Sequence, residues 1–356
     1  AGIPGHQEIE LGLLRLYEVT GKENYKDLAR YFIEQRGKDP DYFVKERKKR
    51  GWVHFDMDVH NREYNQAHAT VYEQKEAVGH SVRAVYMYTA MAELASLYKD
   101  EKLYQACCDL WENMTQKRMY ITGGIGSTVD GEAFTIDYDL PNDTAYSESC
   151  AAIALAFFAR RMLEIQPKSE YADVMESALY NTTLAGMALD GKSFFYVNPL
   201  EVVPEACHRD ERKAHVKPVR QKWFGCACCP PNIARIVEDV QQYAYTIGDD
   251  SSTLYVHLYM GGGVHARLSG TDVRLDVMSD MPWSGKGSVA VGFDAGDSAS
   301  DASKDAVFTI ALRLPAWAGG ETASDAVTVR GRDDISRVIR DGYLYLTGAW
   351  HDGDVV

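Results

Sequence analysis

The sequence predicts a mainly α-helical protein with a β-rich tail. Apolar residues recur at helical spacing in three consecutive helical hairpins at a period of about 70 residues, which favours an α-solenoid or a closed α/α toroid. Strand-like alternation begins near residue 253. We therefore predict a helical solenoid or toroid over residues 1–248 and a β-sandwich domain, which the end of the chain truncates, over residues 249–356.

The three hairpins are predicted from apolar residues spaced three and four apart on either side of a break. The first spans residues 7–36 and breaks at Gly21, and the second spans residues 77–118 and breaks at residues 99–101. The third spans residues 147–189 and breaks at Pro167. Long segments that carry glycine and aromatic residues join them, and such loops on a rigid scaffold usually carry function.

A fourth helix is predicted over residues 232–245, and the pattern then changes to short alternating runs. Turns rich in Gly, Asp and Ser separate these runs. The predicted strands are residues 254–258, 273–277, 307–312 and 343–346.

The composition is that of a soluble globular protein, with 356 residues, 46% apolar and 25% charged. Its net charge of −14 argues against a nucleic-acid partner, and it has no apolar run long enough for a membrane span. We predict a cytoplasmic protein. The sequence leaves open whether it forms a homo-oligomer. The first residue is Ala and the last residues resemble the start of a strand, so we expect a piece of a longer chain.

Seven cysteines indicate reduced thiols or metal ligands rather than a disulfide framework. Cys226, Cys228 and Cys229 precede a predicted helix start, where the helix dipole favours thiolates. Small buried side chains are the alternative, but three thiols in four residues favour a metal. Zn²⁺ needs about four ligands, and Glu148 and Cys150 at another helix start are the candidate partners.

Further candidates lie beside the other helix starts and in the loop before residue 147. His6 and His80 occupy equivalent hairpin starts, although a lone histidine is more often structural. Glu132 is flanked by small and apolar residues, which we expect to raise its pKa toward general-acid use. The alternative for Glu132 is a solvated loop carboxylate.

Four segments together resemble the zinc-dependent β-L-arabinofuranosidases of glycoside hydrolase family 127. They are residues 123–132, 147–150, 177–181 and 228–232, with the specific motifs Glu-Ser-Cys and Cys-Cys-Pro-Pro-Asn. The resemblance covers essentially the whole chain and implies a retaining exo-glycosidase with a six-hairpin α/α barrel followed by β-sandwich domains. We find three hairpins and part of a fourth, so the barrel is expected to be incomplete here.

The resemblance also implies a role for individual residues. It implies that Cys228 is the nucleophile and Glu132 the general acid/base, and that the substrate is an arabino-oligosaccharide with a terminal β-L-arabinofuranose. The implied zinc ligands are Glu148, Cys150, Cys228 and Cys229, and the implied sugar contacts are His80, Tyr196, Glu176 and His6.

Two alternatives from other classes stay open on the sequence. One is a non-catalytic glycan-binding protein in which a structural zinc site fixes a loop to a helix. The other is a toroidal sugar isomerase, or a glycosidase that uses only histidines and carboxylates. In both, His6, His80 and Glu132 would be the catalytic residues.

Overall fold

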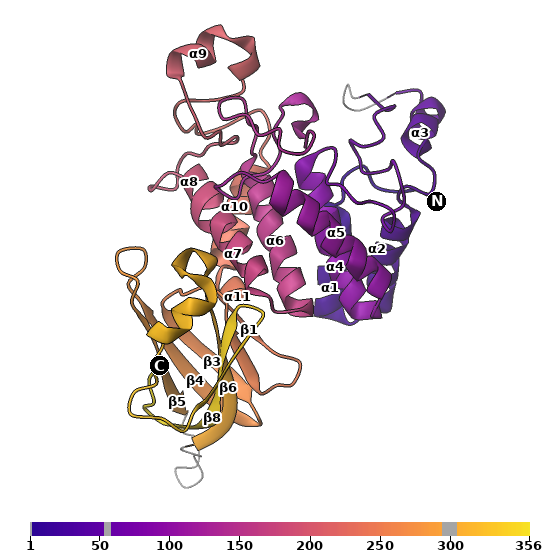
Figure 1. Ribbon diagram of the computed structural model, residues 1–356. Helices are drawn as coiled ribbons and strands as arrows, with labels where there is room; N and C mark the ends of the chain where they lie inside the picture. The colour runs from indigo at the N-terminus through magenta and orange to yellow at the C-terminus, as the bar shows by residue number, and fades with distance from the viewer. Residues whose placement is uncertain (1, 53–57, 294–304) are drawn as a thin grey trace. The chain divides into compact units, whose positions relative to one another are not determined.

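The computed structural model describes residues 2–52, 58–293 and 305–356 (Figure 1). The chain forms two compact units. One comprises Ala1–Ile165 with Val174–Ile236 and is helical, and the other comprises Gln166–Asp173 with Val237–Val356 and holds the strands. The prediction of a helical part followed by a β-rich part is confirmed.

The three predicted hairpins are present. Their long helices are α1 (Glu8–Thr20), α2 (Glu23–Gln35), α4 (Ser81–Tyr98), α5 (Glu101–Lys117), α6 (Ser149–Ile165) and α7 (Ser169–Ser177). The third hairpin continues into a π-helix (Ala178–Thr183) and α8 (Leu184–Gly186). The sequence analysis missed α3 (Tyr42–Arg50) and α9 (Pro204–Arg209). None of the described helices is both long enough and apolar enough to cross a lipid bilayer.

The predicted breaks have clear physical causes. Gly21 ends α1 in the left-handed conformation at φ 66°, which glycine adopts without strain. Asp100 precedes α5, and its carboxylate accepts hydrogen bonds from the backbone N–H groups of Lys102 and Leu103. Helix α4 contacts α1, α5 and α6 and is buried along most of its length. Its first turn therefore has a fixed position in the helical unit.

The predicted helix over residues 232–245 is wrong at both ends. Helix α10 begins earlier and spans Cys229–Glu238, and a short α11 spans Gln241–Ala244. Residues Tyr245–Ile247 form strand β1, which pairs antiparallel with β2 (Thr253–Val256). Aromatic and β-branched residues favour this extended pairing over a further helical turn.

The β unit consists of two sheets that share one apolar core. The first sheet has the order β1-β2-β6-β8-β7 and the second the order β3-β4-β5. Trp350 is fully buried in the core, and its indole N–H donates to the Phe308 carbonyl at 3.1 Å. The remaining strands are β3 (Gly262–Leu268), β4 (Thr271–Ser279), β5 (Gly287–Phe293), β6 (Asp305–Arg313), β7 (Ser336–Arg340) and β8 (Tyr343–His351).

Glu10 of α1 and Arg36 form a fully buried charged pair in the helical unit. Arg36 Nη2 lies 3.8 Å from Glu10 Oε1, and Arg36 also donates to the carbonyls of Asn65 and Pro4. Burial raises the pKa of Glu10 to about 7, and Arg36 only partly offsets this. The folded chain therefore holds a proton on Glu10 more tightly than the unfolded chain does.

This pair predicts a pH-dependent stability. Stability from Glu10 is present below its unfolded pKa and is lost as the pH rises toward 7, a loss of about 3 kcal/mol. We expect Glu10→Gln to remove this part of the pH dependence, measured as the difference in unfolding free energy from the parent chain by denaturant titration at several pH values. Glu23→Gln, at an exposed site on α2, is the control. Equal slopes for both variants would contradict the prediction.

Candidate active site

Glu132 lies at the tip of a tight backbone turn. Thr128 and Ala133 exchange two backbone hydrogen bonds across the turn, and Gly131 and Glu132 both have positive φ, 71° and 53°. A non-glycine residue in this conformation is uncommon, and strained residues of this kind gather at functional sites. Ala133 also bridges to the backbone of His80, so the turn brings Glu132 to the start of α4.

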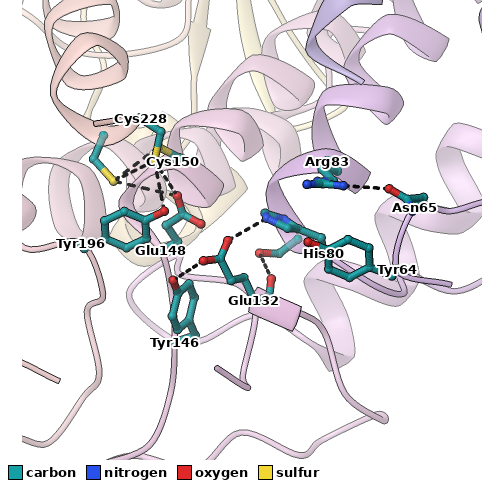
Figure 2. Close-up of polar contacts among 12 residues, drawn as sticks. Tyr64, Asn65, His80, Arg83, Glu132, Tyr146, Glu148, Cys150, Tyr196 and Cys228 are labelled. Carbon is teal, nitrogen blue, oxygen red and sulfur yellow. Dashed lines mark hydrogen bonds and ion pairs between the residues drawn. The ribbon is translucent and has the colours of Figure 1, made fainter. Parts of the chain in front are cut away.

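Two side chains hold the Glu132 carboxylate (Figure 2). His80 Nε2 lies 2.8 Å from Oε2, and the Tyr146 hydroxyl donates to Oε1 at 2.7 Å. Burial raises the pKa of Glu132, but the bonds from His80 and Tyr146 outweigh it, so the pKa lies below its ordinary value. The expectation of a raised pKa is therefore wrong, because it rested on the surroundings of Glu132 in the sequence and did not include the contacts that His80 and Tyr146 make with its carboxylate.

The segment that leads into α6 is held from both sides. Ser147 N–H donates to the Gly126 carbonyl, and Ser149 N–H donates to the Tyr196 carbonyl. A Cβ at Gly124 would lie 2.0 Å from Ser147 Oγ, and a Cβ at Gly123 would lie 2.5 Å from the backbone of the π-helix. The glycines of this loop therefore permit close packing against Ser147, the residue before Glu148, and against the π-helix.

The cysteine loop ends where α10 begins. Cys228 immediately precedes the helix, and its carbonyl accepts a hydrogen bond from Asn232 N–H. The Asn232 side chain donates to the Tyr86 hydroxyl of α4 at 2.8 Å, which ties α10 to the neighbouring helix. The sulfur of Cys228 thus sits at the positive end of the helix dipole, as predicted.

Glu148, Cys150, Cys228 and Cys229 converge, with ligand atoms all within 4.8 Å of one another. Figure 2 labels Glu148, Cys150 and Cys228. Cys150 Sγ lies 3.5 Å from Cys229 Sγ, which lies 3.7 Å from Cys228 Sγ. Glu148 Oε1 lies 3.3 Å from Cys228 Sγ and 3.9 Å from Cys229 Sγ. The two segments, far apart in the sequence, therefore form one cluster.

These four residues fit a tetrahedral zinc ion. With Zn–S bonds of about 2.3 Å and a Zn–O bond of about 2.1 Å, tetrahedral edges are about 3.8 Å between sulfurs and about 3.6 Å from sulfur to oxygen. Burial raises the pKa of Glu148 well above its ordinary range, and the charges of Cys228 and Glu132 raise it further. An ionised form of such a buried acidic cluster needs a cation, which a thiophilic metal supplies.

Cys228 is the accessible thiol of the cluster. Cys150 and Cys229 are 1% and 0% exposed, whereas Cys228 is half-buried. Hydrogen bonds from Cys150 and Cys229 lower the pKa of Cys228 and outweigh the effect of burial. The geometry therefore favours Cys228 as the sulfur that meets a substrate. Its sulfur also lies 3.2 Å from the Tyr196 hydroxyl.

The other predicted residues, His6 and Glu176, are outside the potential metal-binding groups among the described residues. The His6 ring faces the rings of His80 and Tyr86, at centroid distances of 6.4 and 5.9 Å. Glu176 is buried near the end of α7 and is not part of the metal-ligating groups among the described residues. All seven cysteines lie in the described part of the chain, and none of them forms a disulfide bond.

Sequence reasoning missed three contributors to the site. Tyr146 binds Glu132, the ring of His215 lies 5.9 Å from that of Tyr146, and Tyr86 anchors Asn232. The position of Tyr146, two residues before Glu148, was a weak signal. The other two contacts join residues that are far apart in the sequence, Tyr146 with His215 and Tyr86 with Asn232, so no local pattern could reveal them.

Comparison with known proteins identifies the class as a glycoside hydrolase. Residues 1–242 match the family model described as β-L-arabinofuranosidase, GH127 catalytic domain, and residues 253–356 match the GH127 middle domain. The chain belongs to glycoside hydrolase family 127, so the resemblance predicted from the motifs is confirmed.

Individual proteins and solved structures are also similar to this chain. The chain is 40% identical over 347 residues to a non-reducing end β-L-arabinofuranosidase of Bifidobacterium longum subsp. longum, covering 97% of this chain and 51% of that protein. A GH127 β-L-arabinofuranosidase structure from Geobacillus stearothermophilus T6 superposes with a TM-score of 0.89 at 50% identity, covering 99% of this chain and 53% of that one. A GH127 β-arabinofuranosidase gives 0.81 at 34% identity, covering 100% and 51%. The chain spans about half the length of these relatives.

Proposed function

We propose that the protein is a zinc-dependent, retaining β-L-arabinofuranosidase that releases terminal β-L-arabinofuranose from arabino-oligosaccharides. The observation that carries the proposal is the accessible Cys228 sulfur in a Glu-Cys₃ cluster, next to the accessible carboxylate of Glu132. A ring nitrogen of His80 and carboxylate oxygens of Glu132 and Glu148 lie within 4.8 Å of one another. The named activities of the similar proteins support the substrate. We further propose that the helical unit is an arc of an α/α toroid.

In the first step, Cys228 Sγ attacks the anomeric carbon of the terminal sugar. The bond to the aglycone oxygen breaks, and Glu132 gives that oxygen its proton. The products are a thioglycoside on Cys228 and a released alcohol. His80, Tyr196, His6 and Glu176 are the proposed contacts to the sugar.

Glu148, Cys150, Cys228 and Cys229 would hold the zinc ion. When bound, zinc supplies positive charge that keeps the Cys228 sulfur ionised and stabilises it as a leaving group. Glu148 and the two buried cysteines have no need of solvent access for this role, which agrees with their burial.

In the second step, Glu132 acts as a base. Hydrogen bonds from His80 and Tyr146 hold the pKa of Glu132 below its ordinary value, and formation of the thioglycoside removes the negative charge of Cys228 that opposes them. The lower pKa of Glu132 then favours its ionised form, which takes a proton from water as the water attacks the anomeric carbon. The sulfur departs, and the two inversions give net retention.

The test follows hydrolysis of a chromogenic β-L-arabinofuranoside by the purified protein with methanol as a competing acceptor. We expect methyl β-L-arabinofuranoside in the NMR spectrum, because its anomeric centre does not equilibrate after release. Removal of the metal with a strong chelator should abolish turnover, and added Zn²⁺ should restore it.

Each rival function has its own outcome in this test. Zinc-loaded protein that binds the glycoside without turnover would support the non-catalytic glycan-binding protein. Turnover that survives chelation and thiol alkylation would support chemistry by His6, His80 and Glu132 alone. The α-configured methyl product would contradict retention.

A further inference from the structure

Tyr146 binds the proposed acid/base from a rigid, buried position. Tyr146 is 6% exposed, and its hydroxyl donates a hydrogen bond to Glu132 Oε1 at 2.7 Å. The ring packs against the rings of His215 and Tyr196, at centroid distances of 5.9 and 6.0 Å. His215 is held in turn, because its Nε2 lies 3.2 Å from the Thr144 carbonyl. The phenol therefore has little freedom to leave Glu132.

Tyr146 also begins the five-residue segment that carries two of the proposed metal ligands. Its carbonyl accepts a hydrogen bond from Asn198 N–H, and the following Ser147 has a positive φ of 40°. The backbone of Glu148 forms an isolated antiparallel β-bridge with that of Val197. One short, tightly held segment thus contacts the acid/base through Tyr146 and supplies the thiol cluster through Glu148 and Cys150 (Figure 2).

A carboxylate needs two restraints to fix its plane. In this site His80 holds Oε2 and Tyr146 holds Oε1, from separate elements on opposite oxygens of Glu132. If either contact is lost, the carboxylate can rotate about its last bond, and proton transfer depends steeply on such geometry.

We propose that Tyr146 is a positioning residue for the reaction: its hydroxyl fixes the Glu132 carboxyl relative to the Cys228 thiol. The inference rests on the proposed function. It assigns to Tyr146 and the segment that follows it the role of setting the distance between the Glu132 carboxyl and the Cys228 thiol. The segment Tyr146–Cys150 then acts as a spacer between the proton donor and the nucleophile.

The test compares Tyr146→Phe with Tyr98→Phe in the purified, zinc-loaded protein. Tyr98 ends α4, about 26 Å along the helix from its start, and its hydroxyl also donates to a carboxylate, that of Asp27 at 3.0 Å. Both variants remove one such hydroxyl. For each variant, kcat/KM is measured on two substrates, a 4-nitrophenyl β-L-arabinofuranoside and an alkyl β-L-arabinofuranoside. Only the alkyl leaving group depends strongly on a proton from the general acid.

For Tyr146→Phe we expect a loss of about 10- to 100-fold on the alkyl glycoside and of about 3-fold or less on the nitrophenyl glycoside. The alkaline limb of its pH profile should also move to higher pH, because the hydrogen bond from Tyr146 lowers the pKa of Glu132. Zinc content and thermal stability should match those of Tyr98→Phe, which should keep parental kinetics on both substrates.

Two results would overturn the inference while the proposed function stands. One is parental activity of Tyr146→Phe on both glycosides, and the other is an equal loss on both, which would indicate a general structural defect. A parent protein that turns over neither glycoside would instead overturn the proposed function together with the inference.

Discussion

Replacement of Cys228 with serine is expected to reduce hydrolysis by about 10³-fold or more. Serine keeps the size of the side chain but has no thiolate at neutral pH, so the attacking atom is lost. Cys228 is also a proposed metal ligand, so zinc content must be measured alongside activity. A variant that keeps its zinc and loses turnover would assign the loss to the nucleophile.

Covalent trapping separates the nucleophile from the ligands without any mutation. An electrophilic mimic of β-L-arabinofuranose should label Cys228 of the parent protein, and peptide mass spectrometry locates the adduct. Cys108→Ser, on α5 outside the cluster, is the matched control and should keep both labelling and turnover. Undiminished hydrolysis by Cys228→Ser, or an adduct on Cys226, would contradict the assignment.

Glu132→Gln is expected to reduce turnover of alkyl arabinofuranosides by about 10²- to 10⁴-fold, because the amide cannot deliver a proton. The amide keeps the shape of the carboxyl, and the Tyr146 hydroxyl can still donate to its carbonyl oxygen. The alkaline limb of the kcat/KM profile should disappear, since the titrating carboxyl is gone. The measurement is initial rates across pH on alkyl and 4-nitrophenyl glycosides.

An external nucleophile provides the second readout for Glu132→Gln. Azide needs no general base, so it should accelerate turnover of the nitrophenyl glycoside and give a β-configured glycosyl azide. Asp130→Asn, two residues earlier at an exposed position of the same turn, is the control and should keep parental rates. Parental rates for Glu132→Gln on the alkyl glycoside would exclude Glu132 as the acid.

Much of the helical scaffold could be predicted from local pattern. The spacing of apolar residues, the glycine at residue 21 and the polar break at Asp100 predicted the first two hairpins, because these signals act within a few residues. Helix α3 was missed because its run of charged residues has no apolar stripe. Strand β1 was missed because its pairing with β2 crosses a turn and overrides a helical pattern.

The candidate site was predictable to the level of residue type and motif. The density of thiols near a helix start indicated a metal, and the resemblance named the same four residues that the structure brings together. The pKa of Glu132 was predicted in the wrong direction, because sequence neighbours do not report His80 and Tyr146 as partners.

The sequence by itself determined the helical hairpins, the β-rich tail, the chemistry available to the site and membership of the family. Only the tertiary structure decided which thiol is accessible and which side chains hold Glu132. Exposure and hydrogen bonding depend on segments such as residues 128–133, 146–150 and 228–232 meeting in space. That meeting is a property of packing, which acts between residues far apart in the chain and leaves no periodic trace in it.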